Sequence, residues 1–107
     1  MQTNTAPIYR TLGPAADLAD NYVNPYYLED LKRRIAVARI TGKLFAFDDL
    51  HNECPLSAGL LSGTTIMSQG DGSKFDVTSG AVLRGPATTP LATYEVRETN
   101  GNIEVRI

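Results

Sequence analysis

Hydrophobic and polar residues alternate along several short stretches of the chain, a pattern that predicts β-strands. The stretch RIAVARI (34–40) alternates with a period of two, and LFAFDD (44–49) follows it after a TGK turn. The chain ends in TYEVRETNGNIEVRI (93–107), where alternating residues flank an Asn-Gly pair. Because Asn-Gly favours the tight turn of a two-residue hairpin, this last stretch predicts the clearest hairpin of the chain.

The middle of the chain predicts shorter strands separated by turns. TTIMSQ (64–69) and KFDVTSG (74–80) pair across a Gly-Asp-Gly turn, and AVLRGPATTP (81–90) passes from a short strand into a proline-bearing loop. HNECPLSAGLLSG (51–63) lacks a period and is predicted to be a loop.

The first part of the chain is less regular. IYRTL (8–12) predicts one short strand, whereas YYLEDLKRR (26–34) is compatible with a helical turn or with the approach to a strand. Pro25 excludes a long helix through this region. Since no stretch of ten residues has a convincing helical period, we predict an all-β fold, a small antiparallel sandwich or a small barrel, that forms a single domain over residues 1–107.

Composition narrows the classes of function. With 107 residues and a formal net charge of -2, the chain lacks the basic surface typical of nucleic-acid binding. It contains no apolar run near the roughly 20 residues of a membrane-spanning helix, and we expect a soluble, cytoplasmic protein. Its one Cys excludes an internal disulfide, and its one His excludes the usual Cys/His zinc sites.

Four stretches, in order and spacing, carry a family resemblance: CPLSAGLL (54–61), GSKFDVTSG (72–80), GPATTPLATYEV (85–96) and GNIEVRI (101–107). From Arg34 to the C-terminus the sequence resembles the Rieske ferredoxin family, whereas residues 1–33 match weakly. The resemblance implies a small antiparallel sandwich of two sheets, with a cluster-binding subdomain formed by His51–Asp71 and covered by a proline loop at 85–90. The loops that correspond to the family's cluster loops lie within residues 48–72. The resemblance also implies Cys-x-His in the first loop and Cys-x-x-His in the second, as ligands of a [2Fe–2S] cluster.

The residues found at those positions differ from the family pattern. The four positions equivalent to cluster ligands are occupied by Asp49, His51, Ser68 and Asp71, so that only His51 is retained. Alternatively, two residues that include the first thiolate have been deleted before His51. Many members also have an additional Cys in each loop, and the resemblance places that former disulfide at Cys54, which is retained, and Gly70, which is not.

From these replacements we expect no cofactor, with [2Fe–2S] as the family expectation only. We therefore predict a structural or partner-binding module of the Rieske fold that has lost its cluster, without catalytic residues or enzymatic activity. One alternative is a Rieske-type ferredoxin, an electron carrier of an oxygenase system that is an altered version of a cluster-bearing parent. Another is a mononuclear metal site at His51, with Asp49 and Asp71. The predicted partner is a redox or oxygenase-type protein, with no nucleic acid and no membrane.

Overall fold

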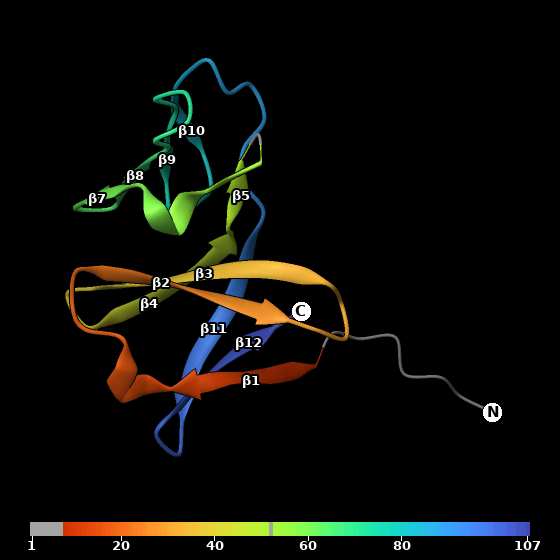
Figure 1. Ribbon diagram of the computed structural model, residues 1–107. Helices are drawn as coiled ribbons and strands as arrows, with labels where there is room; N and C mark the ends of the chain where they lie inside the picture. Colours follow the sequence, from red (N-terminus) through yellow and green to blue (C-terminus); the bar gives the residue numbers. More distant parts are fainter. Residues whose placement is uncertain (1–7, 52) are drawn as a thin grey trace.

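The protein is built almost entirely from antiparallel strands (Figure 1). The computed structural model describes residues 8–51 and 53–107. In chain order the elements are β1 (Tyr9–Pro14), the short 3-10 helix η1 (Ala15–Asp17), β2 (Tyr22–Leu28), β3 (Arg33–Ile40), β4 (Lys43–Asp48), β5 (Leu50–His51), β6 (Cys54–Pro55), the 3-10 helix η2 (Leu56–Ala58), β7 (Leu60–Ser62), β8 (Thr65–Met67), β9 (Lys74–Asp76), β10 (Val82–Arg84), β11 (Thr93–Thr99) and β12 (Asn102–Arg106). The predicted all-β fold is confirmed.

The larger sheet contains six strands in the order β1-β12-β11-β4-β3-β2. It bends at β11, so that β2, β3 and β4 lie over β1 and β12 (Figure 1). A first hydrophobic core fills the space between these layers, and its buried members are Ala15, Leu18, Leu28, Ile35, Val37, Ala46, Ile103 and Val105. The predicted closing hairpin is confirmed, because Thr99 lies opposite Asn102 across the Asn100-Gly101 turn.

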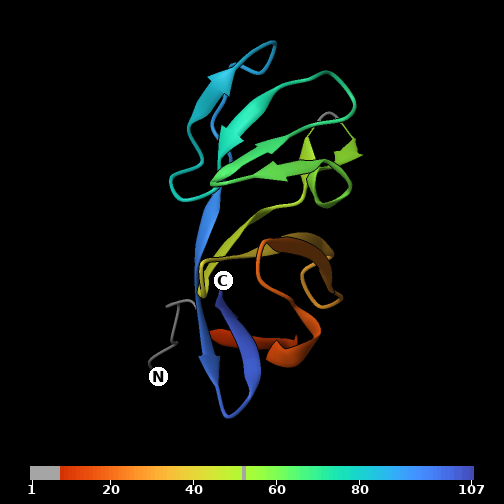
Figure 2. The same cartoon turned by 90° about the vertical axis from the view of Figure 1, so that its left-hand side faces the viewer.

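The second half of the fold is smaller and stands at the opposite end of the molecule (Figure 2). It consists of a sheet in the order β10-β9-β8-β7 and the two-stranded β5-β6 hairpin. A second hydrophobic core lies beneath it, and its buried members are Ala36, Ala38, Ile40, Phe47, Leu56, Ile66, Phe75 and Val77. The predicted pairing across the Gly-Asp-Gly turn is confirmed, because Ile66 of β8 lies opposite Phe75 of β9.

Strand β3 belongs to both cores. Ile35 and Val37 enter the first core, whereas Ala36 and Ala38 enter the second. All four side chains have an exposed fraction of 0%. Small alanines on one face allow the second layer to approach closely, and the branched residues fill the wider space on the other.

The N-terminal region forms strands on both sides of η1. β2 includes Pro25, which lies opposite Ala36 of β3, and β2 is the last strand of its sheet. A proline is tolerated on an edge strand because its missing N–H can fall on the unpaired side. The ambiguous stretch 26–34 therefore holds the end of β2, a turn and the start of β3. The first seven residues of the predicted region 1–33 lie outside the described part of the chain.

The predicted loop over residues 51–63 contains more pairing than expected. His51 pairs with Cys54 in the β5-β6 hairpin, and Leu60 pairs with Met67 of β8. Strands of two or three residues are too short to show an alternating pattern, so the sequence gives no signal for them. Residue 52, within the predicted loop region 48–72, lies outside the described residues. None of the helices in the described part is long and apolar enough to cross a membrane.

Candidate functional site

Three segments meet at the end of the molecule formed by the smaller sheet. They are the β5-β6 hairpin, the turn 68–73 between β8 and β9, and the proline loop 85–90. The side chains of His51 and Asp71 join the first two segments. The Ala87 N–H donates a hydrogen bond of 2.9 Å to Ser73 Oγ, which joins the second segment to the third. The structure thus brings together the loops that the sequence analysis singled out.

The contact between the two loops is a short polar link. His51 Nε2 lies 2.8 Å from Asp71 Oδ2, and both side chains are largely buried, with exposed fractions of 14% and 21%. The His51 and Phe75 rings also pack in a T-shaped arrangement, with ring centroids 5.1 Å apart. Since an ionised carboxylate can only accept, the ring donates its Nε2 proton to Asp71. Two of the predicted ligand positions are therefore bonded to each other.

The environment of Asp71 favours its ionised form. The Ser73 N–H donates a 2.9 Å hydrogen bond to Asp71 Oδ1. This backbone hydrogen bond is the largest cause of a lowered pKa of Asp71, from 3.8 to about 2, and His51 contributes in the same direction. Asp71 is thus a stable anion that fixes the turn and the histidine together.

We expect Asp71→Asn to weaken the acid sensitivity of the fold. Because the pKa of Asp71 is lower in the folded chain, the carboxylate stabilises the fold above about pH 4, and this contribution is lost as the pH falls towards about 2. The urea concentration at the midpoint of unfolding is measured for the wild type and the variant between pH 6 and pH 2. The difference between the two midpoints should be largest at pH 6 and smallest at pH 2. Asp17→Asn, at an exposed position of η1, is the matched control. An unchanged pH profile in Asp71→Asn would contradict this role.

Ser68 is buried at the start of the second loop, with an exposed fraction of 1%. Its hydroxyl oxygen accepts a 3.2 Å hydrogen bond from the Gly70 N–H, and its backbone N–H donates to the Ser73 carbonyl. The side chain therefore shapes the turn from within.

Cys54 and Gly70 face each other across the two loops. A Cβ placed on Gly70 would lie 2.5 Å from Cys54 Sγ and 3.2 Å from Cys54 Cβ. Disulfide-bonded cysteines have Cβ atoms about 3.5–4.5 Å apart, so the two positions are close to bridging distance. The two positions predicted from the resemblance therefore lie next to each other, and their assignment as a former disulfide stays a prediction.

Asp49 is engaged in a different direction. Its carboxylate is fully buried and accepts hydrogen bonds from the Ser57 N–H, at 2.6 Å, and from the Ser57 hydroxyl, at 2.9 Å. It also forms an ion pair with Arg34. Among the described residues no three His, Cys, Asp or Glu side chains are arranged to hold a metal ion. The structure therefore joins His51 to Asp71 and does not add Asp49 to them.

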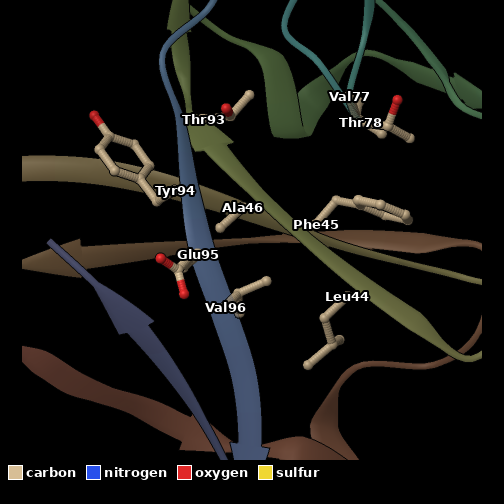
Figure 3. A pocket seen from close by; sticks show the side chains of 9 residues that line it. All are labelled: Leu44, Phe45, Ala46, Val77, Thr78, Thr93, Tyr94, Glu95 and Val96. Carbon is tan, nitrogen blue, oxygen red and sulfur yellow. The ribbon is translucent and has the colours of Figure 1, made fainter.

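A groove lies where β4 and β11 separate (Figure 3). The two strands pair only at Thr93–Phe47 and Tyr94–Ala46. Beyond these pairs the groove, of about 410 Å³, is lined by Leu44, Phe45, Ala46, Val77, Thr78, Thr93, Tyr94, Glu95 and Val96. The Tyr94 hydroxyl donates a 2.6 Å hydrogen bond to Asp48. The pKa of Tyr94 is raised to about 12, mainly because the hydroxyl is shielded from water and in addition because of this hydrogen bond. Sequence reasoning missed the groove because its walls come from strands that are distant in the chain.

Comparison with known proteins identifies the family. The family model described as Rieske [2Fe-2S] domain matches residues 10–95, which include most of β1, both loops and the start of β11. The chain belongs to the Rieske [2Fe-2S] domain family. The match includes most of the N-terminal region that the sequence analysis found only weakly similar.

Individual relatives agree with this membership. The chain is 32% identical to the ferredoxin subunit of anthranilate 1,2-dioxygenase from Burkholderia cepacia over 78 residues, 71% of this chain and 72% of the relative. The solved ferredoxin of Sphingomonas yanoikuyae B1 superposes with a TM-score of 0.85 and 26% identity, covering 94% of this chain and 99% of that one. A chain in the complex of reduced oxygenase and oxidized ferredoxin in carbazole 1,9a-dioxygenase superposes with a TM-score of 0.84 and 25% identity. The superposition covers 94% of this chain and 94% of that one.

The family membership corrects the prediction that the protein has no cofactor. The matching family is defined as a [2Fe-2S] domain, and the relatives are ferredoxins, so membership implies a [2Fe–2S] cluster. The comparisons likewise do not show a degenerate iron-sulfur site. The predicted class of partner, a redox or oxygenase-type protein, is confirmed for the family by the solved complex of an oxygenase with a ferredoxin.

The donor atoms of this chain differ from those that a Rieske cluster uses. Such a cluster is held by two Cys and two His side chains. The predicted ligand positions here supply one imidazole, one hydroxyl and two carboxylates, and the hydroxyl and both carboxylates are already hydrogen-bonded within the protein. The residues present therefore do not fit the family's ligand set.

Proposed function

We propose that this chain is the ferredoxin-type component of an oxygenase system, a small electron carrier that docks on a redox or oxygenase-type protein. The observation that supports the proposal most strongly is the match along nearly the whole length of solved ferredoxins, including one bound to an oxygenase. The 32% identity to the ferredoxin subunit of anthranilate 1,2-dioxygenase, over 71% of this chain, supports the same proposal. The cytoplasmic location remains a prediction.

The donor atoms at residues 49, 51, 68 and 71 favour a second candidate function. In this function the chain binds the protein partner of an oxygenase system as a docking module. In that case the loops serve as a shaped surface, fixed by the His51–Asp71 link and by the hydrogen bond from Ala87 to Ser73. Both candidates require a protein partner of the same class.

One purification tests the two candidates together. The chain is expressed with iron and sulfide supply, and iron, acid-labile sulfide and visible absorption are measured per chain, alongside co-purification with the oxygenase component of its own cells. Electron carriage requires a coloured protein with stoichiometric iron and sulfide, together with complex formation. A colourless chain that binds the oxygenase component supports the docking role. A chain that neither takes up iron nor binds such a component would contradict both.

A further inference from the structure

The outer face of the smaller sheet carries an unusual set of side chains. Along one row across the strands, Leu60 of β7 lies opposite Met67 of β8, and Met67 lies opposite Lys74 of β9. Leu83 of β10 borders the same hollow. The alternate residues of these strands, among them Ile66 and Phe75, point inwards to the second hydrophobic core. The four outward side chains are named here the outer patch.

The outer patch is concave, and three of its four side chains are apolar. Leu60 and Leu83 have exposed fractions of 56% and 54%, which places them among the most exposed large hydrophobic side chains of the described residues. Together with Met67, Lys74, Ser62 and Thr65 they line a hollow of about 320 Å³. Single exposed leucines are ordinary, whereas apolar residues gathered on one face with a polar rim are typical of a contact surface.

Lys74 is only partly exposed and lies between Met67 of β8 on one side and the exposed Arg84 of β10, which it pairs with, on the other. Among the described residues, no Asp or Glu lies within ion-pair distance of its ammonium group. Asp76, the acidic residue on the same strand, accepts hydrogen bonds from Thr78 instead. A protein that covered the patch would remove water from the Lys74 ammonium, and the cost of this desolvation is offset only by an opposite charge.

We propose that the outer patch is the docking surface for the protein partner, and that the partner presents a carboxylate flanked by apolar side chains, which pairs with Lys74. This inference rests on the proposed function, because it takes the partner to be the oxygenase-type component. Four strands of three residues offer a small area, which suits the transient encounters of redox proteins, commonly below about 1,200 Å². The charge pair gives the complex its orientation, and the leucines exclude water around it.

Site-specific photo-cross-linking in the cells of origin tests the surface. A benzophenone amino acid is placed at Leu83, in the patch, at Leu50, in the β5-β6 hairpin, and at Tyr22, on the distant strand β2; all three positions are exposed. We expect position 83 to cross-link to an oxygenase-type protein, at a peptide that contains Asp or Glu. Lys74→Glu should reduce this adduct roughly tenfold or more, whereas Lys74→Arg, which keeps the charge, should retain it. Melting temperatures of the two variants confirm that both are folded.

The other results overturn the inference in distinguishable ways. An oxygenase adduct at position 50 but not at 83 would show that the partner docks elsewhere, and would leave the proposed function standing. An adduct at 83 with a second copy of this chain, or one unaffected by Lys74→Glu, would exclude the acidic partner. Absence of an oxygenase adduct at all three positions would count against both the surface and the proposed function.

Discussion

Replacing Asp49 by alanine is expected to lower the free energy of unfolding by about 3 kcal/mol. The carboxylate is fully buried, and its loss leaves the Ser57 N–H without its acceptor and Arg34 without its partner. Arg34 keeps a side-chain exposed fraction of 38% and can turn to water, so the effect should fall at the lower end of the range for broken buried ion pairs. Equilibrium unfolding in urea, monitored by circular dichroism, measures it.

Asp30→Ala is the matched control for this experiment. Asp30 also pairs with an arginine, Arg10, but its side chain has an exposed fraction of 60%. Its removal should cost less than about 1 kcal/mol, as is usual for surface ion pairs. Asp49→Asn, which keeps one acceptor for the Ser57 N–H, should fall between the two. If Asp49→Ala and Asp30→Ala lower the free energy of unfolding by the same small amount, the buried contacts of Asp49 contribute no more than a surface ion pair.

Gly70→Cys is expected to form a disulfide with Cys54 on oxidation and to stabilise the fold by about 2–3 kcal/mol relative to its reduced form. A bridge that closes a loop of about 15 residues contributes about 3 kcal/mol, and part is lost here because the two Cβ positions must move apart by a few tenths of an ångström. Thiol titration of the unfolded protein shows whether the bond forms, and melting curves with and without reductant give its effect.

Two variants separate the disulfide from the substitution itself. Gly70→Ala places a Cβ against Cys54 Sγ without a bond, and should be less stable than the wild type unless the thiol rotates away. Gly70→Cys combined with Cys54→Ser removes the bond and should show no dependence on reductant. Two free thiols in the oxidised Gly70→Cys protein would mean that the loops do not face each other as described.

Several strands near the core, and the hairpins that join them, could be predicted from the sequence. RIAVARI and LFAFDD became β3 and β4, and the Asn100-Gly101 turn joined β11 to β12, because period-two alternation and turn residues act locally. The sequence did not reveal that both faces of β3 are buried, since alternation between Ile or Val and Ala separates two apolar faces of different size. The sequence also left open whether the region of β2 forms a strand, because a proline is acceptable in a strand at the edge of a sheet, and the sequence does not show which strand is at the edge.

The candidate site was predicted in part. The counting from family motifs placed His51 and Asp71, and Cys54 and Gly70, at related positions, and the structure brings both pairs together. It could not show that Asp49 turns to Arg34 and Ser57, because that contact depends on how three separate segments pack. Ser73, which links the second loop to Ala87, was missed because a serine in a turn carries no distinctive signal.

Because β3 forms a wall of both hydrophobic cores, the loop-bearing half of this protein is not a transferable module. A segment cut out between β4 and β11 would leave behind Ala36, Ala38 and Phe47, which complete the underside of its core. Grafting the loops onto another member of the family would therefore require the recipient's third strand to carry equally small side chains at the positions of Ala36 and Ala38. Bulkier side chains there would prevent the grafted half from packing against the sheet.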